Sequence, residues 1–166
     1  MDEVTRSIYK QALRLVFSRQ TPADGILELS AIARSAIPHP LWDRLDRLRI
    51  THDVSTLTSW VQAKVPSYKQ SASILYFSLS DLGDELSLIF LKKTREPKSD
   101  NDWAAYNSDV FFLAPCKVLK RMYRLGETEL ADGKGSYTHH GARWIVETCY
   151  PLVYAGLTVS SIMHSL

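Results

Sequence analysis

The sequence predicts an α+β fold: a small antiparallel β-sheet, made of a hairpin at about 73–92 plus a third strand, covered by N- and C-terminal helices. Two observations carry this prediction. Apolar residues recur at helical spacing through the first 66 residues, and then give way to short apolar runs rich in aromatic and β-branched residues, as in strands. The 166 residues are 45% hydrophobic and 23% charged, so we expect one domain over 1–166, with a core large enough to need no metal or disulfide.

The first segment, 1–66, is expected to be mainly helical. Its apolar residues form stripes, and Thr, Pro and Asp stand where helices usually begin or end. Thr21 followed by Pro22 has the pattern of an N-cap with proline in the first turn. The expected helices are 4–17, one that Thr21 caps and Pro38 stops, 41–50, and one that Asp53 or Ser55 caps and Pro66 ends.

The second segment, 73–113, is expected to be mainly β. The apolar runs SILYFSL and LSLIFL flank the turn sequence DLGD, which is typical of a hairpin. A polar loop at 92–102 follows. The third strand is then expected at either Asp102–Tyr106 or Val110–Leu113.

The remaining segments, 115–125 and 142–164, are expected to be helical. Pro115 can begin the first of them and Gly126 can end it. The four glycines of 126–141 and the lack of an apolar period there predict a long surface loop. Pro151 predicts either a kink in the last helix or a break into two short ones.

The cysteine content and the N-terminal sequence indicate a cytoplasmic protein. Only Cys116 and Cys149 are present, the N-terminus lacks the pattern of a secretory signal, and no apolar run approaches the ~20 residues of a membrane span. We therefore expect no membrane association. Twenty basic against eighteen acidic residues give a net charge of +2, from which no nucleic-acid partner is expected.

Three stretches resemble immunity proteins of bacterial polymorphic toxin systems: SILYFSLSDLGDELSLIFLKK, DNDWAAYNSDVFFL and YPLVYAGLTVSSI. The likeness covers residues 73–125 and 150–162. It consists of two apolar strands around a short turn, an acidic loop entering a Trp-containing strand, and a final helix. Inhibitors of basic nucleases are often acidic, so the net charge of +2 argues against a nuclease as the target.

The resemblance implies a protein that binds and occludes a cognate toxin stoichiometrically, with no catalytic residue, metal or cofactor of its own. Affinity would come from aromatic or Arg anchors, and complementary charge would select the partner. The candidate partner-binding residues are Arg95, Asp100, Asp102, Trp103, Tyr106, Lys120, Arg121 and Arg124. For the last three, together with Lys117, the alternative interpretation is the solvated face of an amphipathic helix. For Trp103 the alternative is a place in the core beside the hairpin.

Two other classes of function stay open. One is a small hydrolase that uses Cys116, whose pKa a helix N-terminus and Lys117 would lower, or an acidic cluster with His139 or His140. The other is an adaptor subunit of a bacterial assembly, which an exposed apolar patch would favour. Adjacent histidines point in different directions, so His139 and His140 are not expected to hold a metal.

Overall fold

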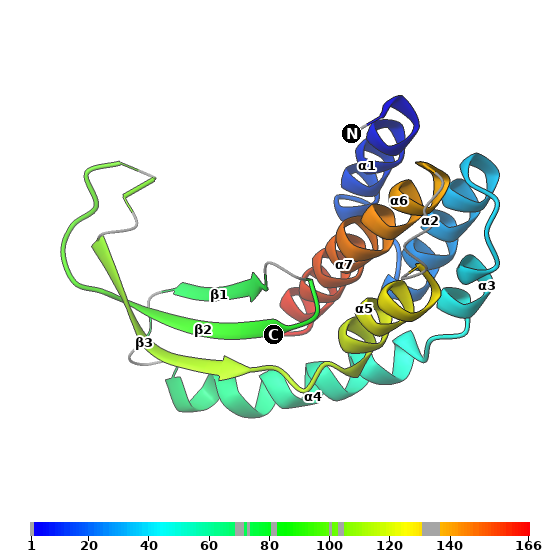
Figure 1. Cartoon of the computed structure of the whole chain (residues 1–166). Helices are drawn as coiled ribbons and strands as arrows, with labels where there is room; N and C mark the ends of the chain where they lie inside the picture. The colour runs from blue at the N-terminus through cyan, green and yellow to red at the C-terminus, as the bar shows by residue number, and fades with distance from the viewer. Residues whose placement is uncertain are drawn as a thin grey trace.

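The computed structural model describes residues 2–68, 72, 74–80, 83–99, 101–102, 105–130 and 137–166, with the backbone alone at 108, 109, 129, 130 and 137–140. It confirms the predicted α+β class, with most helices gathered at one end, the sheet extending from them and α4 running along the sheet (Figure 1). The elements are α1 (Glu3–Val16), α2 (Pro22–Ala36), α3 (Leu41–Asp46), α4 (Ile50–Tyr68), β1 (Ile74–Leu79), β2 (Leu86–Lys93), β3 (Tyr106–Leu113), α5 (Lys117–Leu130), α6 (Tyr137–Trp144), the π-helical turn η2 (Ile145–Cys149) and α7 (Tyr150–Ser165).

The first two helices begin where side chains cap them. The Asp2 carboxylate accepts the Thr5 N–H at 2.8 Å, and the Thr21 hydroxyl accepts the Asp24 N–H at 3.2 Å. Each cap satisfies an amide that has no partner inside its helix. The predicted Thr21–Pro22 start of α2 is therefore confirmed.

The helical core is built around α7, which packs against α1 and α2. The Trp42 ring stacks on the Tyr150 ring with centroids 6.0 Å apart, and the Tyr150 hydroxyl lies 2.8 Å from that of Ser30. The continuous helix from Gly141 to Ser165 is long and apolar enough to cross a membrane by length and composition alone. Most of it is buried inside the fold, as in the central helix of a bundle.

The described strands form an antiparallel sheet in the order β1-β2-β3. The row Phe77–Leu88–Phe112 faces α4, where the Tyr68 ring contacts Phe112 with centroids 5.6 Å apart. Alternate residues point away from α4, because successive side chains of a strand take opposite sides. β3 contains the expected alternative Val110–Leu113, whereas Asp102 lies in the preceding loop.

Several predicted boundaries were wrong. α3 ends at Asp46 and α4 already begins at Ile50, so Asp53 does not cap its own helix. Pro66 lies inside α4 rather than ending it, two residues before the helix stops. Pro66 cannot donate to the Gln62 carbonyl four residues earlier, so the last turn of α4 lacks that hydrogen bond.

The expected stop at Gly126 was also wrong, as was the expected loop at 126–141 over both of its ends, while residues 131–136 lie outside the described part of the chain. α5 continues to Leu130, and α6 begins at Tyr137. Gly126 faces the π-helical turn, where an added Cβ would lie 3.2 Å from Val146 Cγ1. The missing side chain therefore allows two helices to approach closely.

The last helical segment is continuous rather than broken at Pro151. The π-helical turn η2 directly precedes Pro151, and the Tyr150 N–H bonds to the Ile145 carbonyl at its end. A proline cannot donate to the carbonyl four residues earlier and collides with it in a regular α-helix. The π-helical turn η2 is wider than an α-helical turn, and it lies directly before Pro151, where this collision would otherwise occur.

Candidate binding surface

The start of α5 is fixed by a carboxylate from another helix. Asp53 of α4 is 5% exposed. Its Oδ1 accepts the Lys117 N–H at 3.1 Å and its Oδ2 accepts the Val118 N–H at 3.3 Å. A negative charge that accepts first-turn amides is favourable at a helix N-terminus. Asp53 therefore caps α5, although it is far away in the sequence.

Two further side chains complete this buried cluster. The Tyr154 hydroxyl of α7 donates to Asp53 Oδ2 at 2.8 Å, and the Cys116 thiol donates to the same oxygen at 3.2 Å. Burial raises the pKa of the Cys116 thiol to about 12, and the Asp53 charge also raises it. The expectation of a lowered pKa at Cys116 was wrong, because desolvation outweighs the helix N-terminus.

α5 is amphipathic, and its cations lie on its outer side. The residues Val118, Leu119 and Met122 are buried against the helical core. The basic residues Lys117, Lys120, Arg121 and Arg124 are exposed on the opposite side. The predicted division of this helix into an apolar and a basic face is therefore confirmed.

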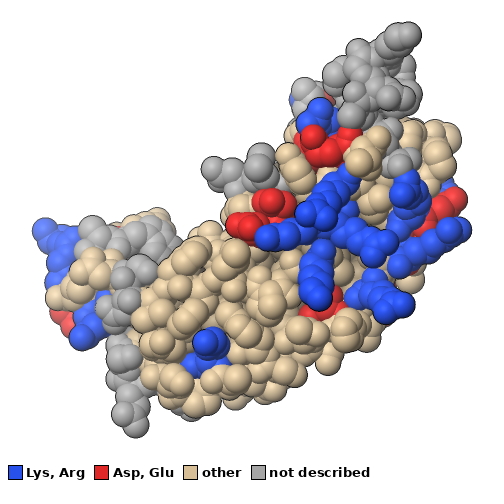
Figure 2. Space-filling view, turned by 60° about the horizontal axis from the view of Figure 1, so that its bottom comes forward, with Lys and Arg blue, Asp and Glu red and all other residues tan. Residues whose placement is uncertain are grey.

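The basic face of α5 borders an open groove. Arg44 of α3 joins the α5 cations there, in a space of about 500 Å³. We call this the basic groove, lined by Arg44, Lys117, Lys120, Arg121, Arg124, Leu125 and Thr128. Figure 2 shows Lys and Arg side chains gathered on this part of the surface, beside a broad area with almost no charge.

Among the described ion pairs, one carboxylate neutralises a cation of α5 in the basic groove. Lys120 Nζ lies 2.9 Å from Glu85 Oε1. Among the described residues, Lys117, Arg121 and Arg124 form no ion pair. Several like charges held together without counter-charges repel one another, and an acidic partner would relieve that repulsion.

The outward side of the sheet is a second exposed surface. The residues Tyr76, Ile89 and Phe111 form one row across the three strands. Phe111 is 60% exposed, and Leu113 on the same side of β3 is 48% exposed. We call these four residues the outer sheet face. Clustered exposed apolar residues of this kind often mark an interaction site.

The other sequence-predicted binding residues that the structure describes lie away from the basic groove. Arg95 and Asp102 form a 3.1 Å ion pair in the loop between β2 and β3, and Tyr106 begins β3. Asp100 and Trp103 lie outside the described residues. This loop is at the opposite end of the sheet from α5 (Figure 1). The structure therefore does not bring the loop residues together with Lys120, Arg121 and Arg124.

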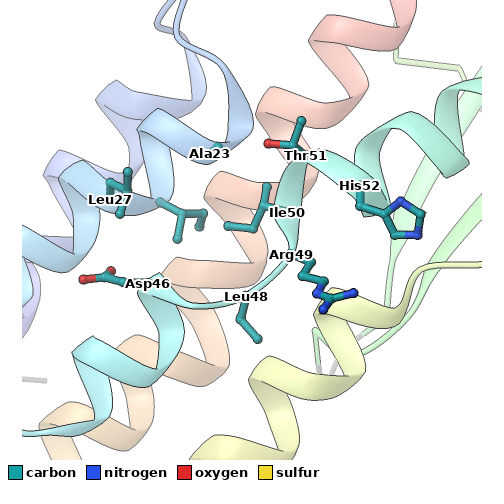
Figure 3. Close-up of a pocket in the computed structure, with 9 residues that line it drawn as sticks. Ala23, Leu27, Asp46, Leu48, Arg49, Ile50, Thr51 and His52 are labelled. Carbon is teal, nitrogen blue, oxygen red and sulfur yellow. The ribbon is translucent and has the colours of Figure 1, made fainter.

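A pocket of about 460 Å³ lies between α2 and the connection from α3 to α4 (Figure 3). Leu27, Leu48 and Ile50 give it a mainly apolar lining. Arg49 and His52 point away from α2 in this view, and the Asp46 carboxylate pairs with Arg34 at 2.7 Å. In specific ligand sites a few polar side chains converge on the ligand. The polar side chains of this pocket do not converge in this way.

The structure adds little about the expected histidines. His139 and His140 belong to helix α6 rather than to a loop, and their side chains lie outside the description. Within the described part of the chain, no three His, Cys, Asp or Glu residues are grouped to hold a metal ion.

Comparisons with protein families, curated proteins and solved structures find no match for this chain.

Proposed function

We propose that the protein acts by binding, as an immunity-type protein that occludes a cognate bacterial toxin in the cytoplasm without catalysis. The observation that carries this proposal is the basic groove, where Arg44 of α3 and the cations of α5 converge and where Lys120 pairs with Glu85. Such a surface favours fast encounter with a partner of opposite charge and selects against other partners. The motif resemblance to immunity proteins adds support.

The main alternative, a hydrolase with Cys116 as nucleophile, lacks a suitable thiol. The nucleophilic form of cysteine is the thiolate. With a pKa of about 12 and 4% exposure, Cys116 stays protonated and largely inaccessible near neutral pH. Its contacts with Asp53 and Tyr154 are those of a structural residue.

The proposal is tested by co-expression with the product of the neighbouring gene. The protein should form a complex with that product. It should also restore the growth of cells that the product alone inhibits. The double variant Arg121→Glu/Arg124→Glu should weaken the complex roughly 100-fold, because two attractive contacts become repulsive. The protection of cell growth should decrease together with the affinity of the complex.

The matched control is Arg6→Glu/Lys10→Glu, which makes the same charge change at two exposed positions of α1. This variant should bind and protect like the wild type. Normal protection by the groove variant, or the absence of any complex and any rescue, would contradict the proposal.

A second function, the adaptor subunit, is favoured by one observation, the outer sheet face. An adaptor would form a stable complex but would not protect cells from any product of a neighbouring gene. The same experiment therefore separates the two classes.

A further inference from the structure

We infer that the outer sheet face and the basic groove work as one surface, which receives an acidic amphipathic segment of a partner protein. This inference rests on the proposed function and adds the chemistry of the partner. It follows from the character of each surface and from the place where the two meet.

The apolar half of the surface has the composition of an interface centre. Phe111 and Tyr76, which are 60% and 42% exposed, lie in one row with Ile89 between them. Leu113 extends the exposed area along β3 towards α5. Covering such side chains would remove apolar area from water, which favours binding.

The basic half begins where β3 ends. The Ala114 N–H donates to the Leu86 carbonyl at 2.8 Å, so pairing with β2 continues one residue past Leu113. α5 then starts at Lys117. On the other side of this junction, Glu85, which precedes β2, pairs with Lys120. The strand end and the first turn of α5 are thus held together.

An apolar patch beside a charged one resembles the centre and rim of a protein interface. The apolar side of a partner segment would cover Phe111 and Leu113, and its carboxylates would reach Lys117, Arg121 and Arg124. The α5 cations span only about 10 Å of helix, since each residue rises 1.5 Å. That length suits a short peptide segment.

A protein partner fits this surface better than a nucleic acid. Strands that bind single-stranded nucleic acid usually present aromatic rings on which successive bases stack. Here aliphatic Ile89 separates the two aromatic residues, and aliphatic Leu113 lies nearest to the cations. The whole-chain charge of +2 also gives little general attraction for phosphates.

The test is an NMR titration of the ¹⁵N-labelled full chain with four probes. The first is a short peptide of Glu, Leu and Phe with its apolar residues on one side. The second has Ser in place of Leu and Phe, and the third has Lys in place of Glu. The fourth is an oligothymidylate of the same charge as the first.

The first peptide should shift amide signals of both the outer sheet face and α5. The Glu/Ser peptide should shift those of α5 alone and bind more weakly, and the Lys peptide should shift neither. Phe111→Ser should weaken binding of the first peptide roughly tenfold, because a large apolar contact is lost. Phe17→Ser, which alters a side chain that is 84% exposed on another part of the surface, is the matched control and should leave binding unchanged.

Equal binding of the first two peptides, or no effect of Phe111→Ser, would overturn the inference. Tighter binding of the oligothymidylate would also overturn it, in favour of a nucleic-acid surface. The titration needs no toxin. If the peptides bind as expected but no neighbouring gene product is neutralised, the proposed function fails while the inference about partner chemistry stands.

Discussion

Asp53 shows how one buried carboxylate can connect three helices. It belongs to α4, accepts the first amides of α5 and receives the hydroxyl of Tyr154 from α7. A buried carboxylate is costly unless donors surround it, and this one has two backbone amides, a hydroxyl and a thiol. Its hydrogen bonds also fix the helix that carries the basic groove.

We expect Asp53→Ala to lower the free energy of unfolding by roughly 2–4 kcal/mol, since α5 loses its cap and buried donors lose their acceptor. Urea denaturation followed by circular dichroism measures the change. The control, Asp43→Ala, removes an exposed carboxylate that pairs with Arg34 at 2.9 Å and should cost less than about 0.5 kcal/mol. A loss at Asp53 no larger than at Asp43 would show that this network does not stabilise the fold.

The sequence predicted part of the candidate surface. The cations of α5 were identified because their spacing places them on one side of a helix. Arg44 and Glu85 were not, since they come from other elements and only the tertiary fold brings them to the groove. Asp53 was expected to cap its own helix, because a local pattern does not distinguish a nearby helix end from a distant one.

Among the helices and strands, those with strong periodicity were predicted best. α1, α2 and the β1–β2 hairpin lie close to their expected bounds, because each buries one clear stripe or has a distinct turn. The errors at Gly126 and Pro66 share a cause. Both residue types usually end helices, but here Gly126 packs against Val146 from inside α5, and α4 continues two residues past Pro66.

Gly83 joins the hairpin to the helical core, and replacing it should show this. Its φ of +70° lies in the left-handed region, and an added Cβ would lie 2.9 Å from the Glu147 carbonyl oxygen and from Pro151. Gly83→Ala should therefore lower the free energy of unfolding by roughly 2 kcal/mol, part from backbone strain and part from the collision. Thermal and urea denaturation measure the loss.

The control for this substitution is Gly141→Ala. Gly141 lies in α6, and a Cβ there would meet side-chain atoms of Ile37 and Thr5 at 3.3 Å. The gain of up to about 1 kcal/mol in helix propensity offsets this contact, so stability should change little. If both substitutions have the same effect, the turn does not depend on the conformation of Gly83.

Across the protein as a whole, the centre of the helical core contains groups that ionise only at high pH. Burial raises the pKa of the Cys149 thiol and that of the Cys116 thiol to about 12. It also raises the pKa of the Tyr150 and Tyr154 hydroxyls. In the unfolded chain these groups meet water and return to their ordinary pKa values. The folded state should therefore lose stability in alkaline solution.

Cys149 gives the clearest measure of this effect, because burial is the sole cause of its shift from an ordinary pKa of 9.0. Between pH 9 and pH 12 the unfolded chain has released the thiol proton that the folded chain retains. The free energy of unfolding then falls with rising pH by roughly 1.4 kcal/mol per pH unit for this group, and below pH 9 the group contributes no slope.

Cys149→Ala should make the slope shallower by that amount, in urea denaturation across the same pH range. Val146→Ala, a second fully buried position in η2, should lower stability at every pH and leave the slope unchanged. Equal slopes in the wild type and Cys149→Ala would mean that the folded protein does not hold this thiol in its protonated form.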